Sequence, residues 1–189
     1  MPRQLRVWYP GAIYHIVARG NRRAAIFIDK QDYLEYLRIL EDVRSMYPFL
    51  LHSYCLMTNH IHLQLETTLY HIQYIMKELH SRYAVYLNIR LKIEGHVFQG
   101  RYGARLIETS DYFLEVSRYI HRNPFEAKMV RKLEDYKWSS YSSYVTPHIN
   151  PHVYKDKTLS YFNEPFHQEY RKFIERKNTN TEEQPCILK

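Results

Sequence analysis

The sequence predicts an α+β protein built on an antiparallel four-stranded sheet with helices on one face. Residues 60–66 alternate strictly between polar and apolar side chains, the pattern of a strand with one buried face. Two longer stretches, 29–47 and 70–91, repeat apolar side chains at helical spacing. Combined with the other strand-like stretches, they give the order β-α-β-β-α-β, which is the ferredoxin-like arrangement.

The first half of the chain supplies three strands and one helix. We expect a strand over 12–19, a turn over 19–23, a helix over 29–47 and strands over 49–57 and 60–66. Pro48 ends the helix, because the residue before a proline is pushed out of helical geometry. Thr58 and Asn59 then form a short turn between the last two strands.

The second half completes the sheet and adds further helices. We expect a helix over 70–91, a connection over 95–103, a strand over 104–109, a helix over 111–123, a short helix or turn over 137–144 and a helix over 164–176. Ser110 is expected to cap the third helix and Pro124 to end it. In the last helix, Phe166, Tyr170 and Phe173 are expected to point inward.

The chain divides into a main domain over 1–145 and a C-terminal extension over 146–189. The extension is expected to be partly helical, with a loose end from residue 178.

The alternation over 60–66 predicts which side chains share a face. Ile61, Leu63 and Leu65 are expected to face the two long helices, and His60 and His62 the open side of the sheet. His15 could share this open face, as a ligand or as a packed histidine. Cys55 is expected to be a small core residue.

Composition narrows the classes of partner and compartment. Lys and Arg number 27 against 20 Asp and Glu, so the net charge is +7, which favours a polyanionic partner such as nucleic acid. Two cysteines are too few for a disulfide scaffold. Residues 45–65 carry no charge, but their polar alternation indicates strands instead of a membrane span. We expect a soluble cytoplasmic protein without membrane contact.

Two histidines on the polar face of a strand are the first candidate site. His60 and His62 stand at i and i+2, so their side chains project from the same face and could share one metal ion. A third ligand is needed, and this strand offers only Gln64 or Glu66 nearby. Two exposed histidines bonded to neighbours or to water remain the alternative interpretation.

Tyr119 and Asn123 form the second candidate, at i and i+4 on one helix face. A tyrosine can attack phosphorus and form a covalent phosphotyrosine, provided that a metal or a donor favours its phenolate. Tyr119 could also be an ordinary aromatic residue, since the chain has 19 tyrosines.

Arginines in exposed loops are the third candidate. The segments RGNRR (19–23) and QGRYGAR (99–105) place guanidinium groups beside Gly and Asn, where they could clamp phosphates. Arg122 adds positive charge on the helix that carries Tyr119. The candidate DNA contacts are therefore Arg19, Arg22, Arg23, Arg101, Arg105 and Arg122. Solvated loops and a solvated helix face would explain the same residues.

Several segments, in order between residues 9 and 144, resemble one family. They are YPGAIYHIVARGNRR, YCLMTNHIHLQLE, GHVFQGRY, YIHRNP and KWSSY. Together they resemble the single-tyrosine HUH transposases, in particular the REP-associated branch of the insertion-sequence transposases. The chain departs from that pattern at Thr58, where the family often has Pro, and at Phe125-Glu126, where it usually has Val-Arg.

The resemblance implies both an activity and site residues. Members of the family cut and rejoin single-stranded DNA next to a hairpin, through a 5′-phosphotyrosine intermediate and with Mg or Mn as cofactor. By resemblance, Tyr119 is the nucleophile on a catalytic helix packed on the sheet, and His60, His62 and Asn123 are the metal ligands. A homodimer, with the tyrosine acting within one chain or across two, is compatible with the family.

Three other functions remain open at this point. A ferredoxin-like sheet with exposed aromatic residues also describes modules that bind single-stranded nucleic acid without catalysis. A histidine pair with bound water could serve a metal-dependent hydrolase, which would leave no covalent adduct. The motifs could also belong to an element that no longer moves.

Overall fold

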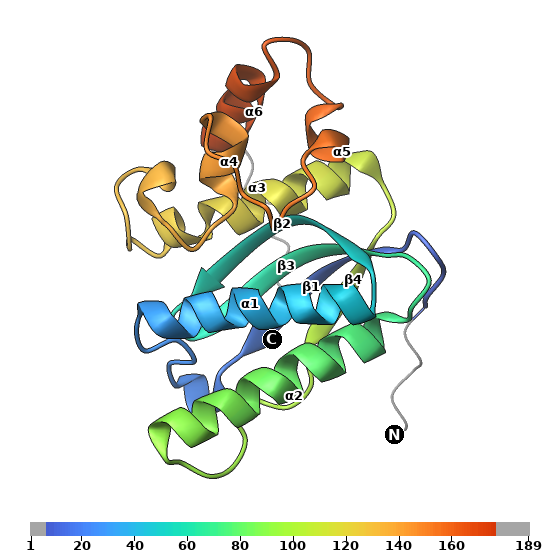
Figure 1. Ribbon diagram of the computed structural model, residues 1–189. Coiled ribbons are helices and arrows are strands. Elements are labelled where there is room, and N and C mark those ends of the chain that lie inside the picture. Colours follow the sequence, from blue (N-terminus) through green and yellow to red (C-terminus); the bar gives the residue numbers. More distant parts are fainter. Residues whose placement is uncertain (1–6, 177–189) are drawn as a thin grey trace.

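The computed structural model describes residues 7–176 and contains the predicted order of strands and helices (Figure 1). Its strands are β1 (Ile13–Arg19), β2 (Phe49–Met57), β3 (His60–Thr67) and β4 (Gly103–Ile107). Its helices are α1 (Lys30–Met46), α2 (Ile72–Leu91), α3 (Ser110–Glu126), α4 (Tyr141–Val145), α5 (Asp156–Leu159) and α6 (Phe166–Glu175), with short 3-10 turns η1 (Asn21–Arg23) and η2 (Leu133–Asp135). No helix in this part of the chain has the length and apolar character that crossing a membrane requires.

The four strands form one antiparallel sheet in the order β2-β3-β1-β4. This order confirms the ferredoxin-like prediction, because two strand-helix-strand units interleave their strands in the same way. The pairing places Arg19 opposite His60 and Val17 opposite His62. β1 therefore pairs with β3 from His60 to Glu66, which includes the histidine motif.

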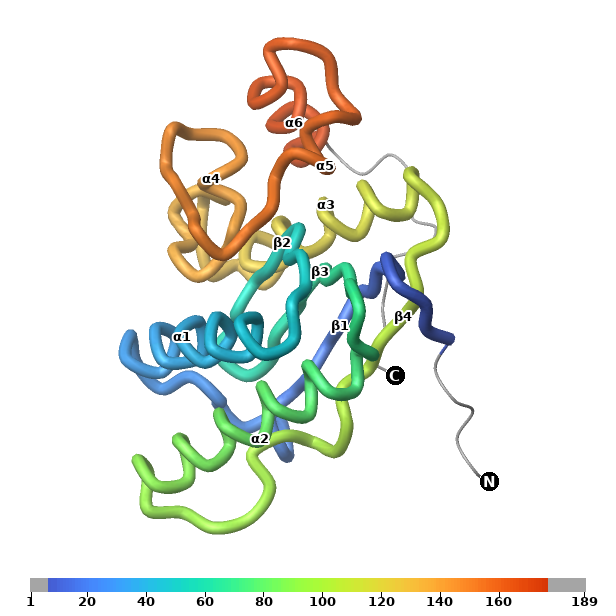
Figure 2. Tube along the Cα trace, turned by 45° about the vertical axis from the view of Figure 1, so that its right-hand side comes forward, coloured from blue at the N-terminus to red at the C-terminus, as the bar shows by residue number. Residues whose placement is uncertain are grey.

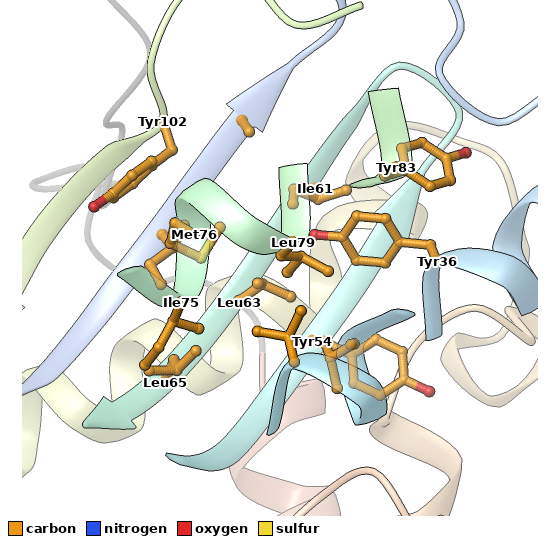
Figure 3. Close-up of a cluster of buried hydrophobic side chains, with 14 of the residues drawn as sticks. Tyr36, Tyr54, Ile61, Leu63, Leu65, Ile75, Met76, Leu79, Tyr83 and Tyr102 are labelled. Carbon is orange, nitrogen blue, oxygen red and sulfur yellow. The ribbon is translucent and has the colours of Figure 1, made fainter. Parts of the chain in front are cut away.

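One face of the sheet packs on α1 and α2, as the alternation over 60–66 predicts. The close-up in Figure 3 shows Ile61, Leu63 and Leu65 of β3 facing side chains of these two helices. The facing residues labelled there are Tyr36 of α1 and Ile75, Met76, Leu79 and Tyr83 of α2. Burial of this apolar face holds both helices on the sheet, because removing apolar surface from water is the main favourable contribution to folding.

The opposite face is covered, so the expectation of an open face is wrong. In Figure 2 α3 lies on the side of the sheet away from α1 and α2. His62 and Gln64 have exposed fractions of 1% and 0%, and Nε2 of Gln64 donates to the Phe113 carbonyl of α3 at 2.8 Å. Apolar residues of α3, such as Val116 and Ile120, pack against Cys55 and Met57 of β2, which explains why the helix settles there.

Both predicted boundaries of α3 are wrong by a few residues. The cap is Thr109 instead of Ser110, because the Thr109 hydroxyl accepts from the Tyr112 N–H at 3.2 Å. Pro124 lies inside the helix, which continues to Glu126. Pro124 has no N–H to donate to the Ile120 carbonyl, but the helical bonding resumes after it, since the Ala127 N–H donates to the Asn123 carbonyl at 2.9 Å. Asn123 thus stays helical, one turn after Tyr119.

The C-terminal part packs over α3 and forms a third apolar cluster. Its buried members are Leu133, Tyr141, Tyr144, Tyr170 and Ile174. Of the three residues expected to point inward from α6, Tyr170 is buried and Phe173 is partly buried. Phe166 is 38% exposed, because it stands at the first position of the helix, outside this cluster. The expected loose end lies outside the described residues.

Candidate active site

The histidine pair lies on the face of β3 that α3 covers. His60 and His62 stand two residues apart, so both rings project from the same face, with centroids 5.0 Å apart. His62 is buried and His60 is partly buried. The two imidazoles thus lie beneath α3, at the N-terminal end of β3, directly after the turn of residues 58 and 59.

The amide of Asn123 reaches both imidazoles from α3. Its Oδ1 lies 3.4 Å from Nε2 of His60, and its Nδ2 lies 3.3 Å from Nε2 of His62. Nε2 atoms of two neighbouring histidines therefore converge on one side chain of the opposite element. These three residues are the ones that the sequence analysis grouped as metal ligands.

Tyr119, one helical turn before Asn123, packs its ring against His62. The centroid of its ring lies 5.3 Å from that of His62, with the rings nearly perpendicular at 88°. The ring of His15, from β1, lies 5.7 Å from Tyr119 and 5.4 Å from His62. Tyr119 and the histidine pair thus meet within a single chain.

The donor set fits a divalent cation only if the amide takes part. No group of three His, Cys, Asp or Glu side chains within residues 7–176 could hold a metal ion. Two imidazole nitrogens with one amide oxygen suit Mn²⁺, while Mg²⁺ prefers more oxygen ligands. The set leaves coordination positions for a phosphate oxygen and for water.

The alternative third ligands on β3 are occupied elsewhere. The Gln64 amide accepts from the Ser53 hydroxyl at 2.8 Å and donates to the Phe113 carbonyl. The Glu66 carboxylate contacts His52 at 2.9 Å and the Lys157 ammonium at 2.7 Å. Neither side chain is bonded to the histidine pair, so Asn123 is the third donor that the structure places there.

Burial keeps the imidazoles neutral, which is the form that binds a metal. It lowers the pKa of His62 well below 6.5, and the nearby His15, His60 and Arg19 lower it further. The pKa of His60 is also lowered by burial, against the opposing effect of the Asn123 contact. Burial lowers the pKa of His15 to about 3, with Arg105 as a second cause.

Five of the six predicted DNA-contacting arginines lie on β1, on β4 or in the loops next to these strands. Arg19 and Arg105 stand on the same sheet face as the histidines, since they pair with His60 and His15 across the sheet. Arg22, Arg23 and Arg101 are exposed in the two loops that follow β1 and precede β4. Backbone bonds join these loops, because the Gln99 N–H donates to the Arg19 carbonyl at 2.8 Å.

Arg122 stands apart from this group. Its guanidinium donates to the Glu126 carboxylate at 2.6 Å and to the Ile174 carbonyl at 3.1 Å. The first contact lies within α3, and the second joins α3 to α6.

Comparison with known proteins gives the family. The family model described as "Transposase IS200 like" matches residues 9–123, which include β1 to β4 and reach Asn123. The chain belongs to the IS200-like transposases. No curated protein matches it.

One solved structure shows the same fold in another transposase. A structure described as a REP-associated tyrosine transposase bound to a REP hairpin matches with a TM-score of 0.67 at 16% identity, covering 82% of this chain and 91% of that one. At this identity the match supports the fold alone. A putative transposase from Deinococcus radiodurans matches with a TM-score of 0.43 at 14% identity, covering 67% of this chain and 95% of that one.

Two residues beside the transposase motifs were not assigned a role from the sequence. His15 is buried, and its Nε2 lies 3.2 Å from Nδ1 of His62, on the ring edge away from Asn123. This geometry places His15 behind His62, on the side away from Asn123. Asn59 contacts His60, and its place next to the motif is the signal that could have drawn attention to it.

Proposed function

We propose that this transposase cleaves and rejoins single-stranded DNA next to a hairpin, with Tyr119 as the covalent nucleophile. The observation that carries the proposal is the packing of the Tyr119 ring on His62, whose Nε2 lies 3.3 Å from the Asn123 amide. A phenol beside a cluster of neutral nitrogen and amide donors is the arrangement that attack on a phosphodiester requires. The membership in the IS200-like family supports the same reaction class.

The proposed reaction exchanges one phosphoester for another. The phenolate oxygen of Tyr119 attacks the scissile phosphorus, and the bond to the 3′ oxygen of the preceding nucleotide breaks. The phenol loses one proton and the leaving oxygen gains one, giving a 5′-phosphotyrosine and a free 3′-OH. Because the phosphoester energy is kept in the link, a second 3′-OH can reverse the attack and join strands without ATP.

His60, His62 and Asn123 would hold a divalent ion, Mg or Mn. When bound, such an ion would reduce the charge on the phosphoryl oxygens and orient the phosphate. The protein's own part is to hold both imidazoles neutral by burial, and to bring Tyr119 and Asn123 to them on one helix.

The hairpin would be bound by the arginines around the first loop. Arg19 lies opposite His60 in the sheet and Arg105 opposite His15. Exposed loops beside them carry Arg22, Arg23 and Arg101, and guanidinium groups pair well with phosphate oxygens. The solved structure of similar fold is described as bound to a REP hairpin, which supports a hairpin as the ligand here. Arg122 would reach DNA only by leaving Glu126 and α6.

We assign the reaction to residues 1–145 and an accessory role to 146–189. The extension contacts the main domain in two places, through Lys157 on Glu66 of β3 and through Tyr170 on Ser117 of α3. Its proposed role is to hold α3 in place over the histidines.

A binding module without catalysis is the main alternative, and one observation disfavours its usual form. Such modules stack bases on the open face of a ferredoxin-like sheet. Here α3 covers that face, and Gln64 at its centre is fully buried.

A covalent-adduct assay tests the proposal. The protein is incubated with labelled single-stranded hairpin DNA and Mn²⁺, and then run on a denaturing gel. We expect a labelled protein–DNA species that disappears in Tyr119→Phe and persists in Tyr74→Phe, whose side chain is exposed on α2. Cleavage without such a species would indicate a hydrolase, and binding alone a non-catalytic module.

A further inference from the structure

Asn59, in the turn between β2 and β3, contacts both the first histidine and the arginine turn. Its Oδ1 lies 2.7 Å from Nδ1 of His60. Its Nδ2 donates to the carbonyl of Arg23 at 3.2 Å. A carbonyl can only accept, so the Arg23 contact determines that the amide nitrogen points to the turn and the amide oxygen to His60.

This orientation determines which nitrogen of His60 carries the proton. An amide oxygen only accepts, so Nδ1 of His60 must donate to Asn59. A neutral imidazole has one ring hydrogen, and Nε2 is therefore left with a lone pair. Nε2 is the atom that faces Oδ1 of Asn123 at 3.4 Å. A lone pair at this position can ligate a cation together with the amide oxygen of Asn123.

We propose that Asn59 is a positioning residue, which holds His60 in the Nδ1–H form and directs Nε2 toward Asn123 and a divalent cation. The cation rests on the proposed function, but the position of the proton is a property of the metal-free protein. Ligating histidines usually donate their other ring N–H to an oxygen, and losing that partner costs about 10–100-fold in metal affinity.

The backbone of the turn between β2 and β3 is held by bonds that the Asn59 side chain does not make. The Gly20 N–H donates to the Asn59 carbonyl oxygen at 2.8 Å, and the Ile26 N–H to the Thr58 carbonyl at the same distance. Changing the Asn59 side chain leaves both of these bonds available. The effect on His60 can therefore be measured in a folded protein.

The first experiment observes the His60 ring in the metal-free protein. Nitrogen-15 NMR of the histidine rings distinguishes the Nδ1–H from the Nε2–H form. We expect wild-type His60 as Nδ1–H and Asn59→Ala to lose this preference. Asn59→Asp should keep the hydrogen on Nδ1, because a carboxylate oxygen also accepts, although this variant, like Asn59→Ala, loses the bond to the Arg23 carbonyl. The matched control is Asn88→Ala on α2, which removes an amide that donates to the Gly95 carbonyl. It should leave the His60 ring unchanged.

The second experiment titrates the same variants with Mn²⁺ in the absence of DNA and measures free Mn²⁺ by EPR. We expect about 10–100-fold weaker binding in Asn59→Ala and recovery in Asn59→Asp. An unchanged His60 ring in Asn59→Ala would overturn the proposal, as would equal damage in both Asn59 variants. If wild type takes up no Mn²⁺, the proposed metal site fails, and the NMR result alone decides the role of Asn59.

Discussion

At the scale of single residues, the arginine turn has an uncommon backbone. Arg22 and Arg23 have φ values of 51° and 62°, in the left-handed region that few residues other than glycine adopt. The Asn21 N–H donates to the Val97 carbonyl at 2.8 Å, and Asn59 bonds the Arg23 carbonyl, so neighbouring segments hold the turn. Backbone strain of this kind is concentrated at functional sites, which agrees with a role in binding DNA.

We therefore predict that the double change Arg22→Ala and Arg23→Ala weakens hairpin binding. A plot of the logarithm of the binding constant against the logarithm of the salt concentration should also have a slope that is shallower by about 2. Each lost phosphate contact contributes about 0.9 to this slope. Fluorescence anisotropy at several salt concentrations measures both. Arg38→Ala, which removes an exposed arginine paired with Glu35 and Asp42 on α1, is the control. An unchanged slope in the double variant would exclude these arginines as phosphate contacts.

His80 of α2 is a partly buried histidine outside the site. Its ring stacks on Phe98 at 4.2 Å, and its Nε2 is buried without a hydrogen-bond partner among the described residues. Burial lowers the pKa of His80 from 6.5 to about 3. Below pH 6.5 the unfolded chain thus takes up a proton that the folded protein excludes, and stability is lost as the pH falls.

We predict that His80→Leu makes the protein less sensitive to acid. Between pH 6.5 and pH 5 this histidine should account for about 2 kcal/mol of lost stability, at 1.36 kcal/mol per pH unit. Urea unfolding at both pH values measures the difference, with the exposed His96→Leu as the control. Equal pH dependence in wild type and His80→Leu would contradict the prediction.

At the scale of elements, a buried hydrogen-bond network fixes α3 above the sheet. The Tyr170 hydroxyl of α6 contacts the Ser117 hydroxyl at 2.7 Å and Nδ1 of His121 at 2.8 Å. Nε2 of His121 contacts the Ser140 hydroxyl at 2.7 Å, and that hydroxyl accepts from the Tyr54 N–H of β2. The helix with Tyr119 and Asn123 is thus tied to α6 and β2 by its opposite face.

We predict that Tyr170→Phe destabilises the protein by about 1–3 kcal/mol, the cost of leaving buried polar partners unsatisfied. It should also lower adduct formation, because α3 is held less firmly over the histidines. Urea unfolding and the gel assay measure the two effects, with the exposed Tyr161→Phe as control. Stability equal to that of wild type would show that the network contributes nothing.

At the scale of the whole molecule, the sheet is enclosed between two layers. Helices α1 and α2 cover one face, and α3 with the C-terminal helices covers the other (Figure 2). The chain returns to the sheet after α4, where the Tyr154 N–H donates to the Leu51 carbonyl at 2.8 Å. Because Tyr119 lies against His62 of its own chain, we propose that one chain carries a complete site.

Mixing two inactive variants tests whether the tyrosine acts within one chain. Tyr119→Phe and His62→Ala each remove a different part of the site, so a mixture regains activity only if chains exchange the helix that carries Tyr119. We expect no covalent adduct from the mixture on the denaturing gel. Recovery of the adduct to a substantial fraction of the wild-type level would show that the tyrosine acts across two chains.

Periodicity along the chain is enough to predict which side chains share a face of each strand or helix. The alternation over 60–66 places Ile61, Leu63 and Leu65 toward α1 and α2, because a strand's side chains point to opposite faces in turn. The same rule puts His60 and His62 on one face. The helical period puts Tyr119 and Asn123 on one face of α3. These are properties of neighbouring residues, and they hold wherever the element packs.

The meeting of the Asn123 face of α3 with the histidine face of β3 depends on how the helix packs on the sheet. α3 follows the sheet in sequence, and its apolar residues could bury themselves only by covering the face that carries the histidines. That packing brings Asn123 to both imidazoles. The pairing of β1 with β3 places His15 on the other edge of His62, and the turn between β2 and β3 places Asn59 on the other edge of His60. Contacts between residues about 60 positions apart cannot be predicted from a local sequence pattern. They form when distant apolar surfaces are buried against one another.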